Sequence, residues 1–242
     1  MGRALRTFLA DLLAPLERDP AASGVLDVVL SYPGFHAITA HRAIHAMHKA
    51  GVPVLQRFLS HVVRFATGIE IHPGAMIGDG FFIDHGMGVV IGATSIIGCN
   101  VTLYQGVTLG GTSLNPGKRH PTLLDNVTVG VGAAVLGDIL IGENAQIGAG
   151  SVVVKDVPAN STVVGIPGRV VSKDGKPTEA REVPSERPHV QMPDPTATMI
   201  ARLEARIRTL EERLASLQAP DMTSSAAASY AVVGDSLDAA AL

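Results

Sequence analysis

Residues 123–153 read LLDNVTVGVGAAVLGDILIGENAQIGAGSVV, and every sixth position of this stretch holds an aliphatic residue. The same period begins at Ile71 and continues, with interruptions, to about Val171. Glycine often follows the leading aliphatic residue, and a small or aliphatic residue stands four positions after it. A period sustained over this length is an internal repeat. The leading positions are Ile71, Ile77, Ile83, Ile91, Ile97, Leu103, Leu109, Leu123, Val129, Val135, Ile141, Ile147 and Val153.

This period predicts a parallel β-helix, because it matches neither the helical period nor the strict alternation of a half-buried strand. Each hexapeptide supplies a short strand and a corner, with the aliphatic side chain pointing inward. Three hexapeptides make a coil of about 18 residues, so that equivalent residues stack about 4.8 Å apart along the axis. Antiparallel strands joined by glycine turns are the alternative, which the constant strand length disfavours.

The bulk composition excludes several classes of protein. The 242-residue chain has a formal net charge of −3, so nucleic acid is not an expected partner. Aromatic residues make up 4% and tryptophan is absent, which suits a narrow solenoid interior. The single cysteine, Cys99, cannot form an internal disulfide, so we expect a reducing, cytoplasmic location. Asp11 interrupts the apolar run after Arg3 and Arg6, so we predict neither a signal peptide nor a membrane span.

The composition changes along the chain and predicts five segments. The 173–195 segment is rich in proline and charge, as linkers are, and the last residues are rich in alanine and serine. The predicted segments are a helical N-terminal domain (1–68), a β-helix domain that carries the activity (69–172), a linker (173–195), a C-terminal helix (196–218) and a disordered tail (219–242).

Within the N-terminal domain, Gly34–Ala50 and Pro53–Gly68 carry apolar residues at helical spacing. Their apolar faces would cover the first coil, because solenoids need capped ends. His41, His45 and His48 could share one face of the first of these helices. Paired histidines can bind a metal ion, but no cysteine or acidic residue lies nearby in sequence to complete a site. We therefore interpret the histidines as a polar helix face and expect no metal.

The C-terminal helix carries an apolar seam with alternating spacings of three and four residues, flanked by arginine and glutamate. This pattern predicts a short self-associating coiled coil, and a single helix packed on the main domain is the alternative. Isoleucine at a with leucine at d favours two strands in isolation, so the symmetry of the main domain would have to decide otherwise. The seam residues are Ile200, Leu203, Ile207, Leu210, Leu214 and Leu217.

Functional residues are expected where the repeat is broken, because the repeats themselves are structural. Asp84 and His85 stand just before a two-residue shift of the period at 89–90, and Arg119 and His120 end a polar insertion at 115–122. These four side chains suffice for base catalysis and for binding a zwitterion. His85 alone could be a surface histidine, and Arg119 alone a solvated charge.

Several motifs together resemble the serine O-acetyltransferases of cysteine biosynthesis. The motifs are EIHPGA (70–75), IDHG (83–86), QGVTLGGT (105–112), RHP (119–121), RDP (18–20) and GFHA (34–37). The resemblance covers about residues 15–173. It implies that the parallel β-helix is left-handed. With the segments predicted above, this gives an α+β chain in which a left-handed parallel β-helix follows the N-terminal helical segment and precedes the C-terminal helix. It also implies a homotrimer with active sites between subunits.

The resemblance further implies that acetyl-CoA and L-serine react to give O-acetyl-L-serine and CoA. His85 would be the general base, a role suited to a group that titrates near neutrality. Glu70, where the family has aspartate, would hold the histidine. Asp19, Asp84, Arg119 and His120 match the positions that bind the amino acid, where L-cysteine would act as a feedback inhibitor.

Coenzyme A would lie along a groove between subunits, and no metal is expected. Direct transfer is favoured, because Cys99 stands in a plain repeat. The N-terminal region is shorter than in the longest family members, so pairing of two trimers through it is not expected. The family's C-terminal isoleucine, which binds the O-acetylserine sulfhydrylase, is replaced by Leu242, so that partner stays open. The implied CoA residues are Gly111, Thr112, Val131, Gly132, Ala149, Lys155 and Arg169.

Three other functions fit parts of the pattern. An acetyltransferase for another acceptor, such as a sugar, would not need Asp19, Asp84 and Arg119. A zinc lyase of the γ-carbonic anhydrase type would need three converging histidines, for which His72, His85 and His120 offer the count. A non-catalytic trimeric scaffold would need none of these side chains.

Overall fold

The computed structural model describes residues 2–178 and 195–218. The chain divides into two compact units, Met1–Met192 and Pro193–Leu242. The predicted sulfhydrylase contact at the C-terminus lies outside the described residues.

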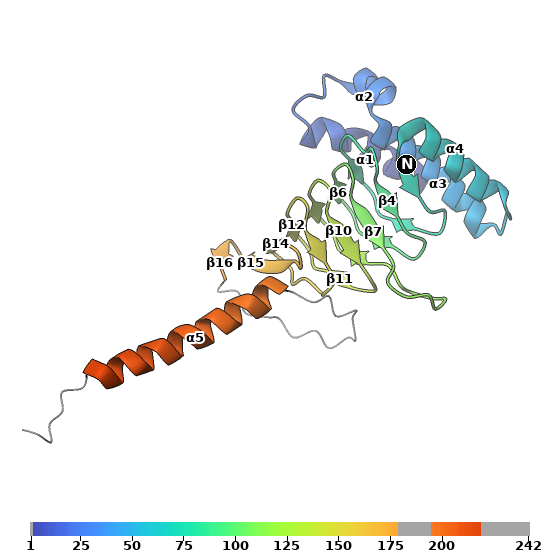
Figure 1. Cartoon of the computed structure of the whole chain (residues 1–242). Coiled ribbons are helices and arrows are strands. Elements are labelled where there is room, and N and C mark those ends of the chain that lie inside the picture. The colour runs from blue at the N-terminus through green and yellow to red at the C-terminus, as the bar shows by residue number, and fades with distance from the viewer. Residues whose placement is uncertain (1, 179–194, 219–242) are drawn as a thin grey trace, which may run out of the picture. The chain divides into compact units, whose positions relative to one another are not determined.

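The first unit contains a parallel β-helix, seen as stacked coils in Figure 1. Its strands form three sheets, here called A, B and C. Sheet A contains β1 (Glu70–Ile71), β4 (Val90–Ile91), β7 (Thr108–Gly110), β10 (Ala134–Leu136) and β13 (Val152–Val153). Sheet B contains β2 (Met76–Ile77), β5 (Ile96–Ile97), β8 (Thr122–Leu123) and β11 (Leu140–Ile141). Sheet C contains β3 (Phe82–Ile83), β6 (Thr102–Leu103), β9 (Thr128–Val129), β12 (Gln146–Ile147), β14 (Ser161–Val164), β15 (Arg169–Lys173) and β16 (Lys176–Pro177).

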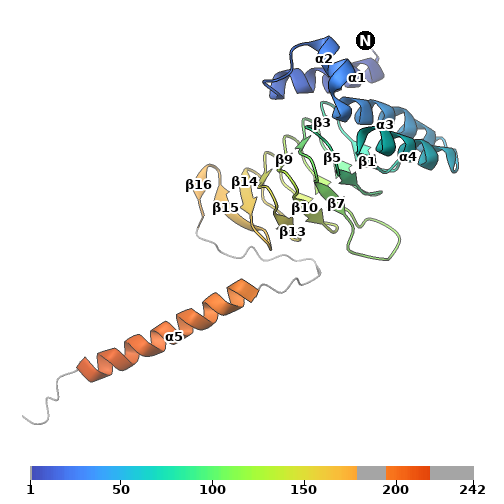
Figure 2. The same ribbon diagram turned by 45° about the horizontal axis from the view of Figure 1, so that its top comes forward.

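The strand register confirms the predicted coil and both of its interruptions. Val90 pairs with Thr108, 18 residues along the chain, as a regular coil requires. Glu70 pairs with Val90 across 20 residues, which accommodates the two-residue shift. Thr108 pairs with Ala134 across 26 residues, because the polar insertion is looped out between β7 and β8. Figure 2 shows this loop extending away from the coils.

The core is a column of aliphatic side chains inside the coils. The leading residues of the hexapeptides are almost all fully buried, and each contributes roughly 1.5–3 kcal/mol through burial. The residue four positions later fills the space between them, as Val101, Val107 and Val127 do. This single cluster explains why the sequence repeats aliphatic residues and has few aromatic ones.

Three corners join the sheets, and each has its own chemistry. The C–A corner comprises residues 84–89, 104–107, 130–133 and 148–151, and the A–B corner comprises 72–75, 92–95, 111–121, 137–139 and 154–156. At the third corner, between sheets B and C, a column of asparagines adopts positive φ. Asn126 donates to Asn144 at 3.1 Å, and Asn144 donates to Asn160 at 2.9 Å. This column links successive coils, and it leaves the other two corners available for function.

Four helices lie at the end of the stack opposite β16 (Figure 1), and α1, α3 and α4 contact the first coil. Arg42 fastens them to the solenoid, since it forms an ion pair with buried Asp11 at 3.1 Å and donates to the carbonyls of Ile77 and Gly78. The two predicted helices are present with slightly different limits. The four helices are α1 (Arg3–Arg18), α2 (Val25–Ser31), α3 (Pro33–Lys49) and α4 (Leu55–Thr67).

At the far end, β15 and β16 add antiparallel strands to sheet C. The strands therefore continue to Pro177, past the expected domain limit at 172 and into the expected linker. The second unit contains α5 (Pro195–Gln218), close to the predicted helix 196–218. Among the described residues, no helix combines the length and apolarity that crossing a membrane requires.

Candidate active site

His85 lies at the C–A corner, in the turn that precedes β4, and its φ is +58°. In the later turns of this corner, glycines such as Gly106, Gly132 and Gly150 adopt the positive φ. A histidine in the left-handed region is uncommon, and backbone strain of this kind is concentrated at functional sites. The turn holds the imidazole outward, with 74% of the side chain exposed.

Asp84 lies beside His85, with 4.0 Å between its Oδ1 and the Nε2 of His85. Its backbone N–H donates to the carbonyl of Leu103 at 2.9 Å, which fixes it to the next coil. The carboxylate is only 20% exposed. A carboxylate and an imidazole therefore stand side by side at this corner.

Asp19 and Tyr32 bring two further polar groups to this corner from the helices. Arg18 donates to the carbonyl of Gly80 at 2.6 Å and so fixes the end of α1 against the solenoid. The Tyr32 hydroxyl donates to Asp19 Oδ2 at 2.7 Å. This bond lowers the pKa of Asp19, and the charge of nearby His85 acts in the same direction. The same bond raises the pKa of Tyr32 to about 12, with a smaller contribution from Asp84. Asp19, Tyr32, Asp84 and His85 therefore form one electrostatic group.

Gly34 allows the helices to approach β3 closely enough to build this group. A Cβ at position 34 would lie 2.1 Å from the carbonyl oxygen of Ile83. Glycine is required here because the start of α3 rests directly on the strand that leads into Asp84. The close contact explains the glycine of the GFHA motif, and it brings Tyr32 near Asp84.

Glu70 does not contact His85 within the described residues. Its carboxylate forms an ion pair with Arg64 of α4 at 3.1 Å. Its backbone N–H donates to the carbonyl of Val89, at the end of the turn that carries His85. In the described chain the Glu70 carboxylate is thus paired with Arg64 instead of the expected His85.

Arg119 and His120 lie at the A–B corner, where the polar insertion returns to the coil. The backbone N–H groups of both residues donate to Thr94 Oγ1, at 3.0 and 3.2 Å. Thr94 N–H donates to His120 Nδ1 at 3.3 Å, so Nε2 carries the hydrogen in the neutral ring. Burial lowers the pKa of His120, and the charges of Arg119 and Lys118 act in the same direction.

Two glycines, which have no side chain, leave the space that the His120 ring occupies. A Cβ at Gly92 would lie 1.9 Å from His120 Cδ2, and one at Gly111 would lie 3.2 Å from its Nε2. The GGT motif therefore supplies the room in which the ring is packed. Thr112 follows it as an exposed residue at the same corner.

The predicted substrate residues occupy two different corners of the triangular coil. Asp84 and His85 precede β4, whereas Thr94, which holds Arg119 and His120, follows β4. Sheet A lies between the two groups, so they do not form one site within a single chain.

The predicted CoA residues divide in the same way. Val131, Gly132 and Ala149 are at the C–A corner, in the turns after β9 and β12. Gly111, Thr112 and Lys155 are at the A–B corner. Arg169 lies apart from both, in β15. Each of the two corners therefore carries some of the residues predicted to bind the amino acid and some of those predicted to bind CoA.

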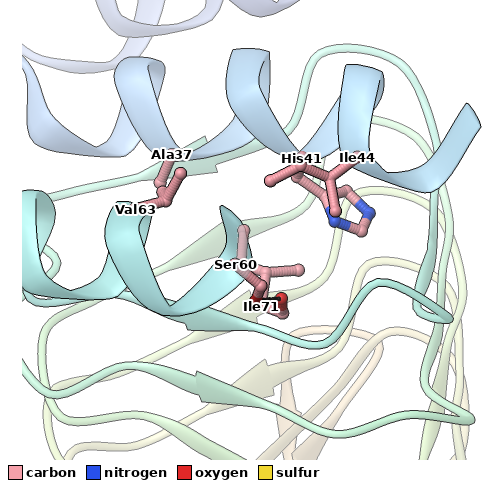
Figure 3. A pocket seen from close by; sticks show the side chains of 6 residues that line it. All are labelled: Ala37, His41, Ile44, Ser60, Val63 and Ile71. Atoms are coloured by element: carbon pink, nitrogen blue, oxygen red, sulfur yellow. Dashed lines mark hydrogen bonds between the residues drawn. The ribbon is translucent and has the colours of Figure 1, made fainter. Parts of the chain in front are cut away.

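A pocket between α3, α4 and β1, shown in Figure 3, is separate from this site. The Nε2 of His41 lies 3.1 Å from the carbonyl of Ala75 and donates to it, while Nδ1 has no hydrogen-bond partner in the described chain. Burial is the main reason that the pKa of His41 falls to about 3. The pocket has room for about one water molecule and is too small for an amino acid. Its lining residues are Ala37, His41, Ile44, Ser60, Val63 and Ile71.

Three histidines of α3, His41, His45 and His48, share one face, and each has a protein partner. The rings of His41 and His45 are 5.5 Å apart, and those of His45 and His48 are 6.3 Å apart. His45 contacts the carbonyl of Pro73 and His48 contacts Gln56. Within residues 2–178 and 195–218, no group of three or more potential ligands is placed to hold a metal ion.

Two polar residues at these corners were missed by sequence reasoning. Tyr32 precedes Pro33 at the start of α3, and the neighbouring GFHA motif was the only signal near it. Thr94 stands in an ordinary hexapeptide turn, and no sequence feature distinguishes it from other repeat threonines. Both act through long-range contacts, which a local pattern does not record.

A solenoid of hexapeptides with an Asp-His turn at one corner and an Arg-His loop at another defines an acyltransferase of the hexapeptide-repeat class. The family profile described as "Serine acetyltransferase, N-terminal" matches residues 2–40. The serine acetyltransferase of Synechococcus elongatus is 52% identical over 230 residues, which cover 95% of this chain and 92% of the relative. That of Bacillus pumilus is 54% identical over 207 residues, covering 86% and 93%. The chain therefore belongs to the serine acetyltransferase family.

Solved structures agree with this assignment. Neisseria gonorrhoeae serine acetyltransferase in complex with serine matches with a TM-score of 0.67 and 45% identity, covering 69% of each chain. The Brucella abortus enzyme in complex with coenzyme A matches with a TM-score of 0.68 and 41% identity, covering 72% of this chain and 69% of that one. A serine acetyltransferase in complex with cysteine matches with a TM-score of 0.68 and 41% identity, covering 69% of each chain. The solenoid is a left-handed β-helix, as the sequence resemblance implied.

Proposed function

We propose that the protein transfers the acetyl group of acetyl-CoA to the hydroxyl of L-serine, giving O-acetyl-L-serine and CoA, the first step from serine to cysteine. The observation that carries this proposal is the group of Asp19, Tyr32, Asp84 and His85 at the C–A corner. It combines a candidate base with carboxylates suited to an ammonium group. We expect the reaction to take place in the cytoplasm.

In the proposed reaction His85 removes the proton from the serine hydroxyl while the oxygen attacks the thioester carbonyl. The C–S bond then breaks, and the imidazolium returns a proton to the leaving thiolate of CoA. Asp84, 4.0 Å from the ring, stabilises the imidazolium. Cys99 takes no part, because it belongs to the corner between sheets B and C. Glu70 is a proposed positioning residue, through its backbone bond to the turn of His85.

The substrate requires both corners. Asp19 and Asp84 are suited to the serine ammonium, and Arg119 can bind its carboxylate with two parallel hydrogen bonds. His120 can add a bond from Nε2–H, since its Nδ1 accepts from Thr94. These groups meet if the A–B corner of one chain faces the C–A corner of the next, which a cyclic homotrimer provides around all three junctions.

The same arrangement forms a groove for acetyl-CoA. Val131, Gly132 and Ala149 of one chain would face Gly111, Thr112 and Lys155 of its neighbour, with Arg169 as a further candidate for the phosphates. The Brucella abortus relative, solved with coenzyme A, supports this co-substrate. No metal ion has a part in the proposed chemistry.

We also propose L-cysteine as an inhibitor at the serine site, because it carries the same ammonium and carboxylate. A serine acetyltransferase has been solved with cysteine bound. Inhibition should therefore be competitive with L-serine, and its complete absence at millimolar cysteine would exclude this part of the proposal.

The proposed function is tested by measuring CoA release from acetyl-CoA with L-serine. His85→Ala should reduce the rate by at least about a hundredfold, the usual effect of losing a general base. The exposed His61→Ala is the matched control and should retain the wild-type rate. A panel of sugars and other hydroxyl compounds tests the acceptor. A wild-type protein that ignores L-serine but acetylates another acceptor would refute the proposal.

A further inference from the structure

Helix α5 presents a row of aliphatic side chains that are exposed among the described residues of the second unit. Ile200, Leu203, Ile207, Leu210 and Leu214 are each between 50% and 58% exposed. They recur at spacings of three and four residues and therefore lie along one side of the helix. In proteins, most of the stability of a helix comes from the packing of its apolar face and not from helix propensity.

The charges beside this seam indicate what covers it. With Ile200, Ile207 and Leu214 at heptad position a, glutamates 204 and 211 stand at e, and arginines 206 and 213 stand at g. In a parallel coiled coil, g of one helix faces e of the next heptad on its partner, so Arg206 of one copy faces Glu211 of another. In an antiparallel pair, g faces g and e faces e, which would bring like charges together.

We propose that α5 pairs with α5 of other copies of this chain as a parallel, in-register, three-stranded coiled coil. The choice of three strands rests on the proposed function, whose active site lies between the chains of a homotrimer. The a and d residues alone would favour two strands. Because α5 belongs to the same chain as the β-helix, a trimer of the β-helix would hold three copies of α5 at high effective concentration.

Cysteine cross-linking of the full-length protein tests the proposal. Cys99→Ser removes the single native thiol, and Leu203→Cys then places one thiol in the seam near the start of α5. Parallel helices bring identical positions together, so mild oxidation should join Leu203→Cys chains in pairs, up to about two-thirds of them in a three-stranded assembly. A trifunctional maleimide should produce a three-chain species. Ala205→Cys, on the opposite side of the helix, is the matched control and should not cross-link.

Charge variants distinguish parallel from antiparallel pairing, because the two arrangements predict opposite changes in the yield of cross-linking. Arg206→Glu should reduce cross-linking at low salt several-fold, and adding Glu211→Arg should restore it. Antiparallel pairing predicts the opposite, because Arg206→Glu would then relieve repulsion. Ile200→Cys repeats the test at the first residue of the seam, where the loss of an aliphatic side chain matters less.

The outcomes separate this proposal from the proposed function. Full acetyltransferase activity without cross-linking at either position, or equal cross-linking at Ala205→Cys, overturns the coiled coil and leaves the enzyme. Pairing of all chains without a three-chain species overturns the three-stranded assembly. An inactive wild type would refute the function, and the cross-linking result would still report on α5.

Discussion

His85 and His120 lie at two different corners of one solenoid, before and after strand β4. His85 is in the turn that enters β4, and His120 is bonded to Thr94 in the turn that leaves it. Sheet A separates the two rings, so they do not share a site within one chain. A site that needs both of them must be completed by a second copy.

This arrangement predicts complementation between inactive variants. His85→Ala should lose at least about a hundredfold in rate, and Arg119→Ala should lose activity through weaker binding of the serine carboxylate. The two chains co-expressed should nevertheless recover activity. About a quarter of the sites in random trimers would join an intact His85 to an intact Arg119 of the adjacent chain. The measurement is CoA release by the purified mixture of differently tagged chains.

The control mixes His85→Ala with Asp84→Ala. Both changes fall on the same corner, so no pairing of these chains restores a site, and the mixture should stay inactive. If the first mixture contains both chains and also stays inactive, the site does not lie between copies.

Tyr32 should matter for binding L-serine because it orients Asp19. Tyr32→Phe removes the hydroxyl that donates to Asp19 at 2.7 Å. We expect KM for L-serine to rise several-fold, with a smaller change in kcat, since binding and not proton transfer is affected. Asp19→Asn should raise KM further. The double variant should be no worse than Asp19→Asn alone, because the two residues act as one unit, and additive effects would contradict this coupling.

Gly34 should tolerate no side chain. Gly34→Ala places a Cβ 2.1 Å from the Ile83 carbonyl oxygen, so α3 must move away from β3. We expect a loss of about 1–3 kcal/mol in the free energy of unfolding, measured with urea, together with a higher KM for L-serine. Gly2→Ala, which has nothing within 4 Å of its Cβ, is the control. An unchanged stability at position 34 would show that the helix is free to shift.

His41 should make the protein less stable in mild acid. Burial lowers its pKa to about 3, whereas the unfolded chain binds the proton near pH 6.5. The stabilising contribution is therefore complete above pH 6.5 and declines as the pH falls from there toward 3. At pH 5 the loss amounts to about 2 kcal/mol. His72, whose pKa is lowered to about 4, acts in the same direction.

The measurement compares urea unfolding at pH 7 and pH 5. His41→Leu should reduce the difference between the two midpoints, because the buried titrating group is gone. The exposed His61→Gln should keep the wild-type difference. If His41→Leu retains the full pH dependence, other groups are responsible.

The sequence by itself determined the solenoid, because a parallel β-helix is the fold that buries an aliphatic side chain at every sixth position. It placed the two-residue shift and the looped insertion, and the strand register later matched both. It also marked the Asp84–His85 turn and the Arg119–His120 loop, since a broken repeat is visible along the chain. These features are local, and local patterns record them.

Only the tertiary structure decided how these residues are distributed in space. The winding of the coil put His85 and His120 at separate corners, and the contact of Gly34 with Ile83 brought Asp19 and Tyr32 to the first of them. It also placed the Glu70 carboxylate in an ion pair with Arg64, although the family resemblance implied a pair with His85. Each outcome depends on contacts between residues far apart in sequence. The packing of the backbone decides whether such contacts form, and the residues adjacent in sequence do not.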